Sequence, residues 1–288
     1  MIDTLLVRRL IETQFPQWKH LPIQPVAVSG WDNRTFHLGE TMLVRMPSSA
    51  DYALQVEKEQ YWLPKLAPSL PLPIPVPLAQ GKPAFDYPWN WSIYRWLPGE
   101  SAATAPITDF CDLARSLAHF LMALEKIDTK KGPLPGLHSF YRGGALTTYD
   151  HETRQAIIAL KDKINTDQAL DLWENALATS WQGPPVWVHG DISAGNLLVQ
   201  NGRLSAVIDF GQLTVGDPAC DLSIAWTLFE GKSREVFRTT LAFDAGTWKR
   251  AQAWALWKAL ITAAGLIDTN NAEGAKCWWI LQQLLYPT

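Results

Sequence analysis

The segment VHGDISAGNLLVQNGRLSAVIDFG, residues 188–211, constrains the fold most because it contains a recognisable β-hairpin. Asn201-Gly202 is typical of the centre of a two-residue type I′ turn, which needs a positive φ at both central positions. An apolar run leads into this turn and a second apolar run leads out of it. With the turn centred there, Leu198 should face Ser205 across the hairpin.

Three polar side chains are expected to meet at the open end of this hairpin. The same register places Asn196 opposite Val207, so Asp209 lies about two residues beyond the partner of Asn196. Asp191 lies in the loop just before the hairpin. Carboxylate and amide oxygens suit a hard cation such as Mg2+, which keeps several waters and bridges phosphates. Asp and Asn are also ordinary loop residues, but His-Gly-Asp followed by this asparagine should occur by chance in roughly one chain in a thousand.

His189-Gly190-Asp191 with Asn196, followed by Asp209-Phe210-Gly211, resembles the catalytic and metal-binding loops of the aminoglycoside phosphotransferase family, relatives of protein kinases. The resemblance implies that Asp191 is the catalytic base or orients the acceptor hydroxyl. It implies that Asn196 and Asp209 hold the two Mg2+ ions, and that His189 braces the loop. Phosphoryl transfer depends mainly on positioning and on neutralising phosphate charge, which these residue types supply.

A further family segment resembles GDPACDLS, residues 216–223, in which Asp221 is expected to fasten the catalytic loop and Asp217 to give structural support. Only five residues separate Gly211 from Asp217, and no Ala-Pro-Glu occurs, so there is no room for an activation loop. Ser193 stands where serine/threonine kinases have a lysine. These departures favour a small-molecule acceptor over a protein.

The rest of the chain changes character near residue 97. Residues 24–47 predict short strands, and a helix is expected from about Asp51 to Leu66 with Asp51 as its cap. A proline-rich extended stretch and a strand in WNWSIYRWLPGE follow, and helices dominate from Ile107 onward. The first of these helices should bury one apolar face that begins at Phe110. The early strands are expected at Pro25–Ser29, Thr35–Leu38 and Thr41–Met46.

This pattern predicts an α+β, two-lobed, protein-kinase-like fold. Residues 1–97 form the expected nucleotide-binding lobe around a small β-sheet, and residues 98–288 form a mainly helical catalytic and substrate-binding lobe. The nucleotide is expected between the lobes. Ser29 and Gly30 lie where a phosphate-covering loop would be, although the Gly-x-Gly-x-x-Gly of protein kinases is absent.

Arg45 stands where protein kinases have a lysine that touches the phosphates. Arginine is also a capable phosphate ligand, but it is forked and always charged. The pattern favours Glu59 over Glu57 as its partner. Tyr94 and Trp96 belong to the hinge that would bind the base through backbone groups, which leaves ATP and GTP both open as donors.

Composition excludes several other classes of protein. The chain has 288 residues, of which 47% are hydrophobic, enough to form a substantial hydrophobic core. Its net charge of −3 does not favour binding to nucleic acid. The start predicts an amphipathic helix without a secretory signal, and the longest apolar run, residues 251–267, is short for a membrane span. The three cysteines are far apart and are interpreted as reduced thiols of a cytoplasmic protein. The oligomeric state is left open.

The acceptor is also left open. Residues 212–288 hold seven acidic and seven basic residues, a balance that weakens the assignment of a polycationic aminoglycoside. Tryptophans in this region either line a pocket or, more commonly for this spacing, form the core. Arg142-Gly143-Gly144 either contacts the substrate or turns the chain. The six tryptophans are Trp226, Trp248, Trp254, Trp257, Trp278 and Trp279.

The sequence therefore predicts Mg2+-dependent transfer of the γ-phosphate of ATP or GTP to the hydroxyl of a small molecule. Antibiotics and metabolic alcohols are both possible acceptors in the family that the chain resembles. The alternative is a degenerate kinase that binds nucleotide without turnover, which Arg45 and the minimal glycine loop suggest. The presence of Asp191, Asn196 and Asp209 together argues against that alternative.

Overall fold

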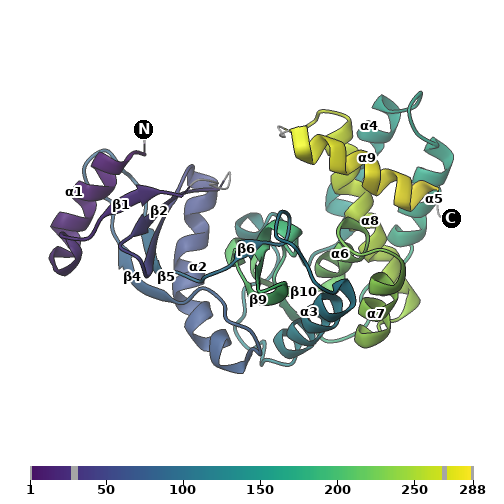
Figure 1. Cartoon of the computed structure of the whole chain (residues 1–288). Helices are drawn as coiled ribbons and strands as arrows, with labels where there is room; N and C mark the ends of the chain where they lie inside the picture. Colours follow the sequence, from purple (N-terminus) through teal and green to yellow (C-terminus); the bar gives the residue numbers. More distant parts are fainter. Residues whose placement is uncertain (1, 27–31, 268–270, 287–288) are drawn as a thin grey trace.

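A computed structural model describes residues 2–26, 32–267 and 271–286 of the chain. Figure 1 shows a sheet-containing N-terminal lobe and a mainly helical C-terminal lobe, with small sheets between them. This is the two-lobed α+β architecture that the sequence predicts. The division at residue 97 stays a prediction, because the larger apolar core contains Leu63, Ile74 and Tyr94 together with the C-terminal helices.

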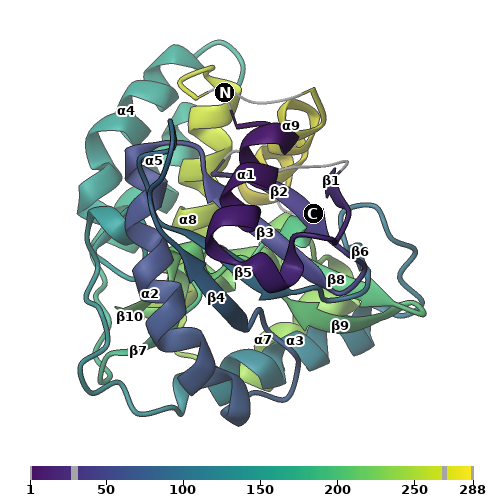
Figure 2. The ribbon, with the colours of Figure 1, turned by 90° about the vertical axis from the view of Figure 1, so that its left-hand side faces the viewer.

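The N-terminal lobe is built on one antiparallel sheet with the strand order β1-β2-β3-β5-β4. Side chains alternate between the faces of a strand. Val44 and Ile93 therefore pack with α1 (Thr4–Gln14) in one apolar core, while their neighbours Arg45 and Tyr94 face α2 (Ala50–Leu66). Figure 2 shows α1 lying over the sheet. The strands are β1 (Ile23–Pro25), β2 (Asn33–Leu38), β3 (Met42–Pro47), β4 (Pro77–Gly81) and β5 (Trp91–Arg95).

The structure corrects two expectations in this lobe. The first strand ends at Pro25 instead of beginning there, and the remainder of the predicted strand lies mostly outside the described residues. Helix α2 begins at Ala50 with Ser49 in the N-cap position, so Asp51 lies in the first turn and is not the cap. A carboxylate there still favours the positive end of the helix dipole.

The predicted hairpin of residues 197–207 lies between the lobes and contains an irregularity that the sequence did not predict. It consists of β8 (Leu197–Gln200) and β9 (Arg203–Val207), and β6 (Glu100–Ser101) extends it. The turn is as expected, but the register shifts after Val199, so Leu198 pairs with Ala206 instead of Ser205. A β-bulge of this kind inserts one residue into a strand and re-aims the side chains beyond it. Consequently Ile208 donates to the carbonyl of Asn196.

A second small sheet supports the catalytic loop from the other side. Strands β7 (Val186–Val188) and β10 (Thr214–Gly216) pair antiparallel, so the segments directly before His189 and directly after Gln212 run side by side. Both strands are largely buried. The predicted catalytic loop, residues 189–196, and the predicted metal loop, residues 209–211, are therefore held at neighbouring ends of two sheets.

The C-terminal lobe packs helices around α8 (Ala245–Ala263), of which twelve of nineteen residues are buried. Helix α3 (Phe110–Glu125) begins at Asp109, whose carboxylate accepts from two backbone amides. Phe110 is exposed and does not belong to the apolar face of α3, because it lies in the first turn, before the buried stripe begins. None of the described helices is long and apolar enough to cross a membrane. The other helices are α4 (Asp150–Ala159), α5 (Thr166–Leu177), α6 (Ile224–Thr227), α7 (Gly231–Leu241) and α9 (Asn271–Leu285).

Candidate functional site

The catalytic loop after β7 is held by one buried carboxylate. Asp221, in the 3-10 helix η7 (Pro218–Ser223), accepts hydrogen bonds from the amides of His189 at 2.7 Å and Gly190 at 2.8 Å. Burial raises the pKa of Asp221 to about 7, against the effect of these two amide hydrogen bonds. Gly190 has φ +87°, and a Cβ there would come within 2.6 Å of the Gln212 carbonyl oxygen, so only glycine fits.

His189 is a fully buried side chain with both ring nitrogens engaged. Its Nε2 lies 3.0 Å from the Ile208 carbonyl oxygen, and its Nδ1 accepts from the Asp191 amide at 3.1 Å. Burial lowers the pKa of His189 to about 4, so the imidazole is neutral at pH 7. The ring also packs on Phe210, with centroids 4.4 Å apart. These contacts join the catalytic loop to the metal loop and fit a structural role.

Asp191 and Asn196 are brought together by direct hydrogen bonds. The Asn196 amide nitrogen donates to the Asp191 carboxylate at 2.8 Å and to the Asp191 carbonyl at 2.9 Å. With its nitrogen so oriented, the amide presents its oxygen to other ligands. Burial and then the charge of Asp209 raise the pKa of Asp191. A carboxylate with a raised proton affinity is suited to accept the proton of an acceptor hydroxyl.

Arg45 of β3 connects the sheet lobe to the metal loop. Its guanidinium donates to Asp209 at 2.7 Å and to Glu59 of α2 at 3.3 Å, whereas Glu57 accepts from Asn90 instead. Although burial favours the neutral acid, Arg45 holds the pKa of Asp209 below its usual range. Asp209 also has φ 67°, an uncommon conformation outside glycine that is typical of functional sites.

Tyr94 and Trp96, both predicted to lie near the base, have different surroundings. The Tyr94 hydroxyl donates to Glu59 at 2.5 Å, so its side chain completes the group around Arg45. Trp96 stacks on His37, and its amide donates to the Thr41 carbonyl at 2.8 Å. The Trp96 amide is therefore already occupied. Ser29 and Gly30 lie outside the described residues.

The donors at this site fit a divalent cation. Asp32, just before β2, has its pKa raised to about 6 by burial and then by the charges of Asp209 and Asp191. Asp32, Asp191 and Asp209 thus repel one another, and only Asp209 is paired with an arginine, Arg45. An additional positive charge would therefore be stabilising among these three carboxylates. Among the described residues, no three His, Cys, Asp or Glu side chains alone could coordinate one ion. Mg2+, which keeps waters and binds phosphate oxygens, needs only the carboxylate of Asp209 and the amide oxygen of Asn196 from the protein.

Asp217 supports this region through an ion pair that the sequence did not identify. Its carboxylate binds the Arg250 guanidinium of α8 at 2.6 Å and also accepts from the Ala219 amide at 3.0 Å. Both partners are almost completely buried. Asp217 thus anchors η7, and with it Asp221, to the largest helix of the C-terminal lobe.

Lys58 is a further residue at the site that sequence reasoning missed. Its ammonium group donates to the Gly211 carbonyl at 2.8 Å and the His138 carbonyl at 3.0 Å, and it lies 2.8 Å from His138 Nδ1. Burial lowers the pKa of Lys58 to about 7, partly offset by Glu59. In the sequence, Lys58 is marked only by its position directly before Glu59, the predicted partner of Arg45. Lys58 ties α2 to the 3-10 helix η6 (Phe210–Gln212) and to η3 (Leu137–Ser139).

The C-terminal tryptophans mostly form the core. Trp226, Trp248, Trp254 and Trp257 are all buried. Trp278 is exposed, and Trp279 packs against the core from a partly buried position. The structure thus favours the core interpretation for four of the six tryptophans.

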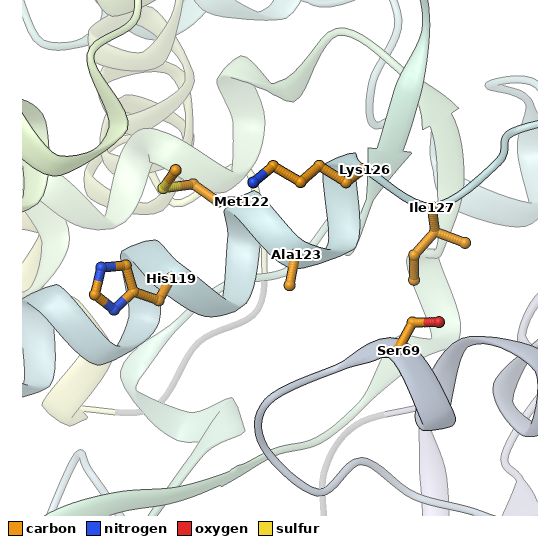
Figure 3. Close-up of a pocket in the computed structure, with 6 residues that line it drawn as sticks. All are labelled: Ser69, His119, Met122, Ala123, Lys126 and Ile127. Carbon is orange, nitrogen blue, oxygen red and sulfur yellow. The ribbon is translucent and has the colours of Figure 1, made fainter.

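A pocket of about 350 Å³ lies beside α3 (Figure 3). His119, Met122, Ala123 and Lys126 line it along the helix, and Ser69 faces Ile127 across it. None of the predicted site residues lines this pocket. We therefore do not assign the phosphoryl-transfer site to it.

Comparison with known proteins identifies the family. Residues 23–258 match the sequence profile of the phosphotransferase enzyme family, APH. The curated protein YcbJ of Bacillus subtilis (strain 168), described as uncharacterized, is 23% identical over 209 residues, which are 67% of this chain and 65% of YcbJ. The match thus spans less than two thirds of that relative.

Solved structures share the fold. Wild-type aminoglycoside 2'-phosphotransferase-IIIa in complex with GDP has a TM-score of 0.70 at 19% identity, covering 98% of both chains. Macrolide 2'-phosphotransferase MphH from Brachybacterium faecium has a TM-score of 0.62 at 20% identity, covering 99% of this chain and 98% of that one. Because the profile match covers most of the chain, the protein belongs to the phosphotransferase enzyme family, whose structures have the protein-kinase-like fold.

Proposed function

We propose that the protein transfers the γ-phosphoryl group of ATP or GTP, with Mg2+, to a hydroxyl of a small molecule. The observation that carries this proposal is the meeting of two loops, one with Asp191 hydrogen-bonded to Asn196 and the other with Asp209, which pairs with Arg45 at 2.7 Å. Solved relatives that bind GDP, and kanamycin in one case, support a nucleotide donor and a small acceptor.

Each residue has a role that follows from its surroundings. Asp191 orients the acceptor hydroxyl and takes its proton. Arg45, freed from Asp209, contacts the nucleotide phosphates, and Glu59 keeps its guanidinium in place. Asn196 and Asp209 would hold Mg2+, which supplies charge neutralisation on the phosphates when bound. The Leu97 amide is the candidate base contact in the hinge, because the Trp96 amide is occupied and Pro98 has none.

Label transfer tests the proposal directly. The purified protein is incubated with Mg2+, γ-labelled ATP or GTP, and a panel of aminoglycosides, macrolides and metabolic alcohols. We expect label on at least one acceptor and its loss by at least about a hundredfold in Asp191→Asn, the range typical of general-base catalysis. Nucleotide binding should persist in that variant. Full activity in Asp191→Asn would contradict the mechanism.

The competing hypothesis is a degenerate kinase that binds nucleotide without turnover. It predicts Mg2+-nucleotide binding with neither acceptor phosphorylation nor nucleotide hydrolysis. Slow hydrolysis of nucleotide by the wild type, lost in Asp191→Asn, would favour the enzyme even before its acceptor is known.

A further inference from the structure

Arg142 is a cation held on aromatic rings beside the catalytic loop. Its guanidinium carbon lies 4.7 Å from the ring centroid of Trp257, 5.1 Å from Trp254 and 5.6 Å from Tyr149. One guanidinium nitrogen, Nη1, donates to the Tyr149 hydroxyl at 2.9 Å and to the Phe140 carbonyl at 3.4 Å. Such packing fixes the plane of the guanidinium and leaves its other donors oriented in advance.

The backbone next to Arg142 is fixed against the strand that leads to Asp217. The Gly143 carbonyl accepts from the Asp217 amide at 2.8 Å. Gly143 has φ +73°, and a Cβ at this position would come within 2.9 Å of Thr214 Cγ2. Thr214 pairs with Val188, the residue directly before His189, so the backbone at Gly143 lies against the two strands that lead into and out of the loop of Asp191. Gly143 therefore places the neighbouring Arg142 beside the strands that hold the loop of Asp191.

Two acidic side chains near Arg142, Asp217 and Glu152, already have partners. Asp217 pairs with Arg250 at 2.6 Å, and Glu152 accepts from the Trp257 indole at 2.5 Å. Among the side chains that the structure describes, no carboxylate forms an ion pair with Arg142. In the described part of the chain, the Nε and Nη2 atoms of Arg142 also have no hydrogen-bond acceptor. The residue is half-buried, so these donors remain accessible to a ligand.

We propose that Arg142 binds an anionic group of the acceptor, a carboxylate or a phosphate, so the preferred substrates are anionic alcohols. The inference rests on the proposed phosphoryl transfer and names the class of its acceptor. A polycationic acceptor would place ammonium groups beside the positive charge of Arg142, where Asp217 and Glu152 are already paired, and a desolvated, unpaired charge is costly. A guanidinium fork binds carboxylate and phosphate in a bidentate manner.

The reaction balances without another reactant. The acceptor hydroxyl oxygen forms a bond to the γ-phosphorus, and the bond from that phosphorus to the β–γ bridging oxygen breaks. The nucleoside diphosphate leaves with the electron pair, and the hydroxyl proton passes to Asp191. The anionic group on Arg142 takes no part in the bond changes and only orients the acceptor.

Matched acceptors test the inference. Label transfer from γ-labelled ATP and GTP is compared for glycerate, glycerol 3-phosphate and glycerol, for gluconate, glucose 6-phosphate and glucose, and for aminoglycosides. The variants are Arg142→Gln, Arg142→Lys and the control Arg238→Gln, whose arginine also lies over tryptophan rings, 5.0 Å from Trp248, but in α7. Comparing the acceptors that carry a carboxylate with those that carry a phosphate shows which of the two anions Arg142 prefers.

We expect label on anionic members of these sets and not on their neutral counterparts. Arg142→Gln should raise the acceptor KM by about tenfold or more, the worth of a charged hydrogen bond, with little change in kcat or nucleotide KM. Arg142→Lys should recover part of the loss, and Arg238→Gln should behave as the wild type. Transfer to neutral alcohols or aminoglycosides alone would overturn the inference and leave the proposed function intact.

Direct anion binding decides the case in which no compound is labelled. Thermal unfolding is then followed with citrate or inorganic phosphate while a non-hydrolysable Mg2+-nucleotide saturates the donor site. A stabilisation that Arg142→Gln abolishes and Arg238→Gln keeps supports the inference, and its absence in the wild type overturns it. Failure to bind any Mg2+-nucleotide would instead count against the proposed function.

Discussion

At the scale of single residues, Arg45 connects the sheet lobe to the loop of Asp209 through a buried ion-pair network. It is almost completely buried and bridges Glu59 and Asp209, two carboxylates from different parts of the chain. Removing one partner of a buried ionic group leaves the others uncompensated, which typically costs about 3–5 kcal/mol. Arg45 therefore stabilises the fold as well as the proposed donor site.

We expect Arg45→Ala to raise the nucleotide KM and to lower the free energy of unfolding by about 3 kcal/mol, the lower end for a broken buried ion pair. Arg45→Lys should be intermediate, because an ammonium group cannot reach both carboxylates in the forked manner of a guanidinium. Steady-state kinetics and urea unfolding measure the two effects. Arg115→Ala, at an exposed position of α3, is the control. An unchanged nucleotide KM in Arg45→Ala would mean that another group holds the phosphates.

At the scale of elements, α2 controls the position of the metal loop from two sides. Glu59 reaches Asp209 through Arg45, and Lys58 holds the carbonyl of Gly211 directly. Adjacent residues of one helix therefore act on both ends of Asp209-Phe210-Gly211, Lys58 directly and Glu59 through Arg45. A shift of α2 would move the proposed metal ligand.

Lys58→Met keeps the length of the side chain but removes the ammonium donors. We expect kcat to fall by about tenfold, because the loss of a charged hydrogen bond of roughly 1.5 kcal/mol or more leaves the Asp209 loop less well positioned. The acceptor KM should change little. Lys65→Met is the matched control, since Lys65 lies exposed on the same helix above the ring of Tyr61. Equal kinetics for the Lys58→Met and wild-type proteins would show that α2 positions the loop without this lysine.

At the scale of the whole molecule, the proposed donor site draws on both lobes. Arg45 lies on β3 and Glu59 on α2 of the N-terminal lobe, whereas Asn196 and Asp209 lie directly before and shortly after the hairpin that contains β9 (Figure 1). A ligand that binds all of them stabilises the native state by mass action, by about 2.7 kcal/mol at a hundred times its Kd.

Saturating Mg2+-nucleotide should therefore raise the midpoint of thermal unfolding by about 5 °C for a chain of this size. Chelation of Mg2+ with EDTA should remove most of that increase. In Asp209→Asn the nucleotide should still stabilise the protein a little, but the part that depends on Mg2+ should be lost. The same Mg2+ dependence in the variant and the wild type would exclude Asp209 as a metal ligand.

The sequence by itself determined the local features of this protein. Asn201-Gly202 specified the hairpin turn, because few other dipeptides accept a positive φ at both positions. Strand alternation and helical periodicity identified the sheet lobe and the helical lobe, and the short span from Gly211 to Asp217 excluded an activation loop. Asp191, Asn196 and Asp209 could be identified as candidate site residues because they lie within one short segment of recognisable residue types and spacing.

Only the tertiary structure decided which distant groups meet. Four such features could not be predicted from the sequence. They are the β-bulge at Ser205, the ion pair of Asp217 with Arg250, the hydrogen bond from Lys58 to Gly211 and the stacking of Arg142 on Trp257. Each depends on how helices and sheets pack against one another. The identity of a lysine or arginine in the sequence does not reveal whether its side chain is solvated or buried in the fold. Packing selects among the many partners that local chemistry permits, because a buried charge is stable only where the folded chain places its complement.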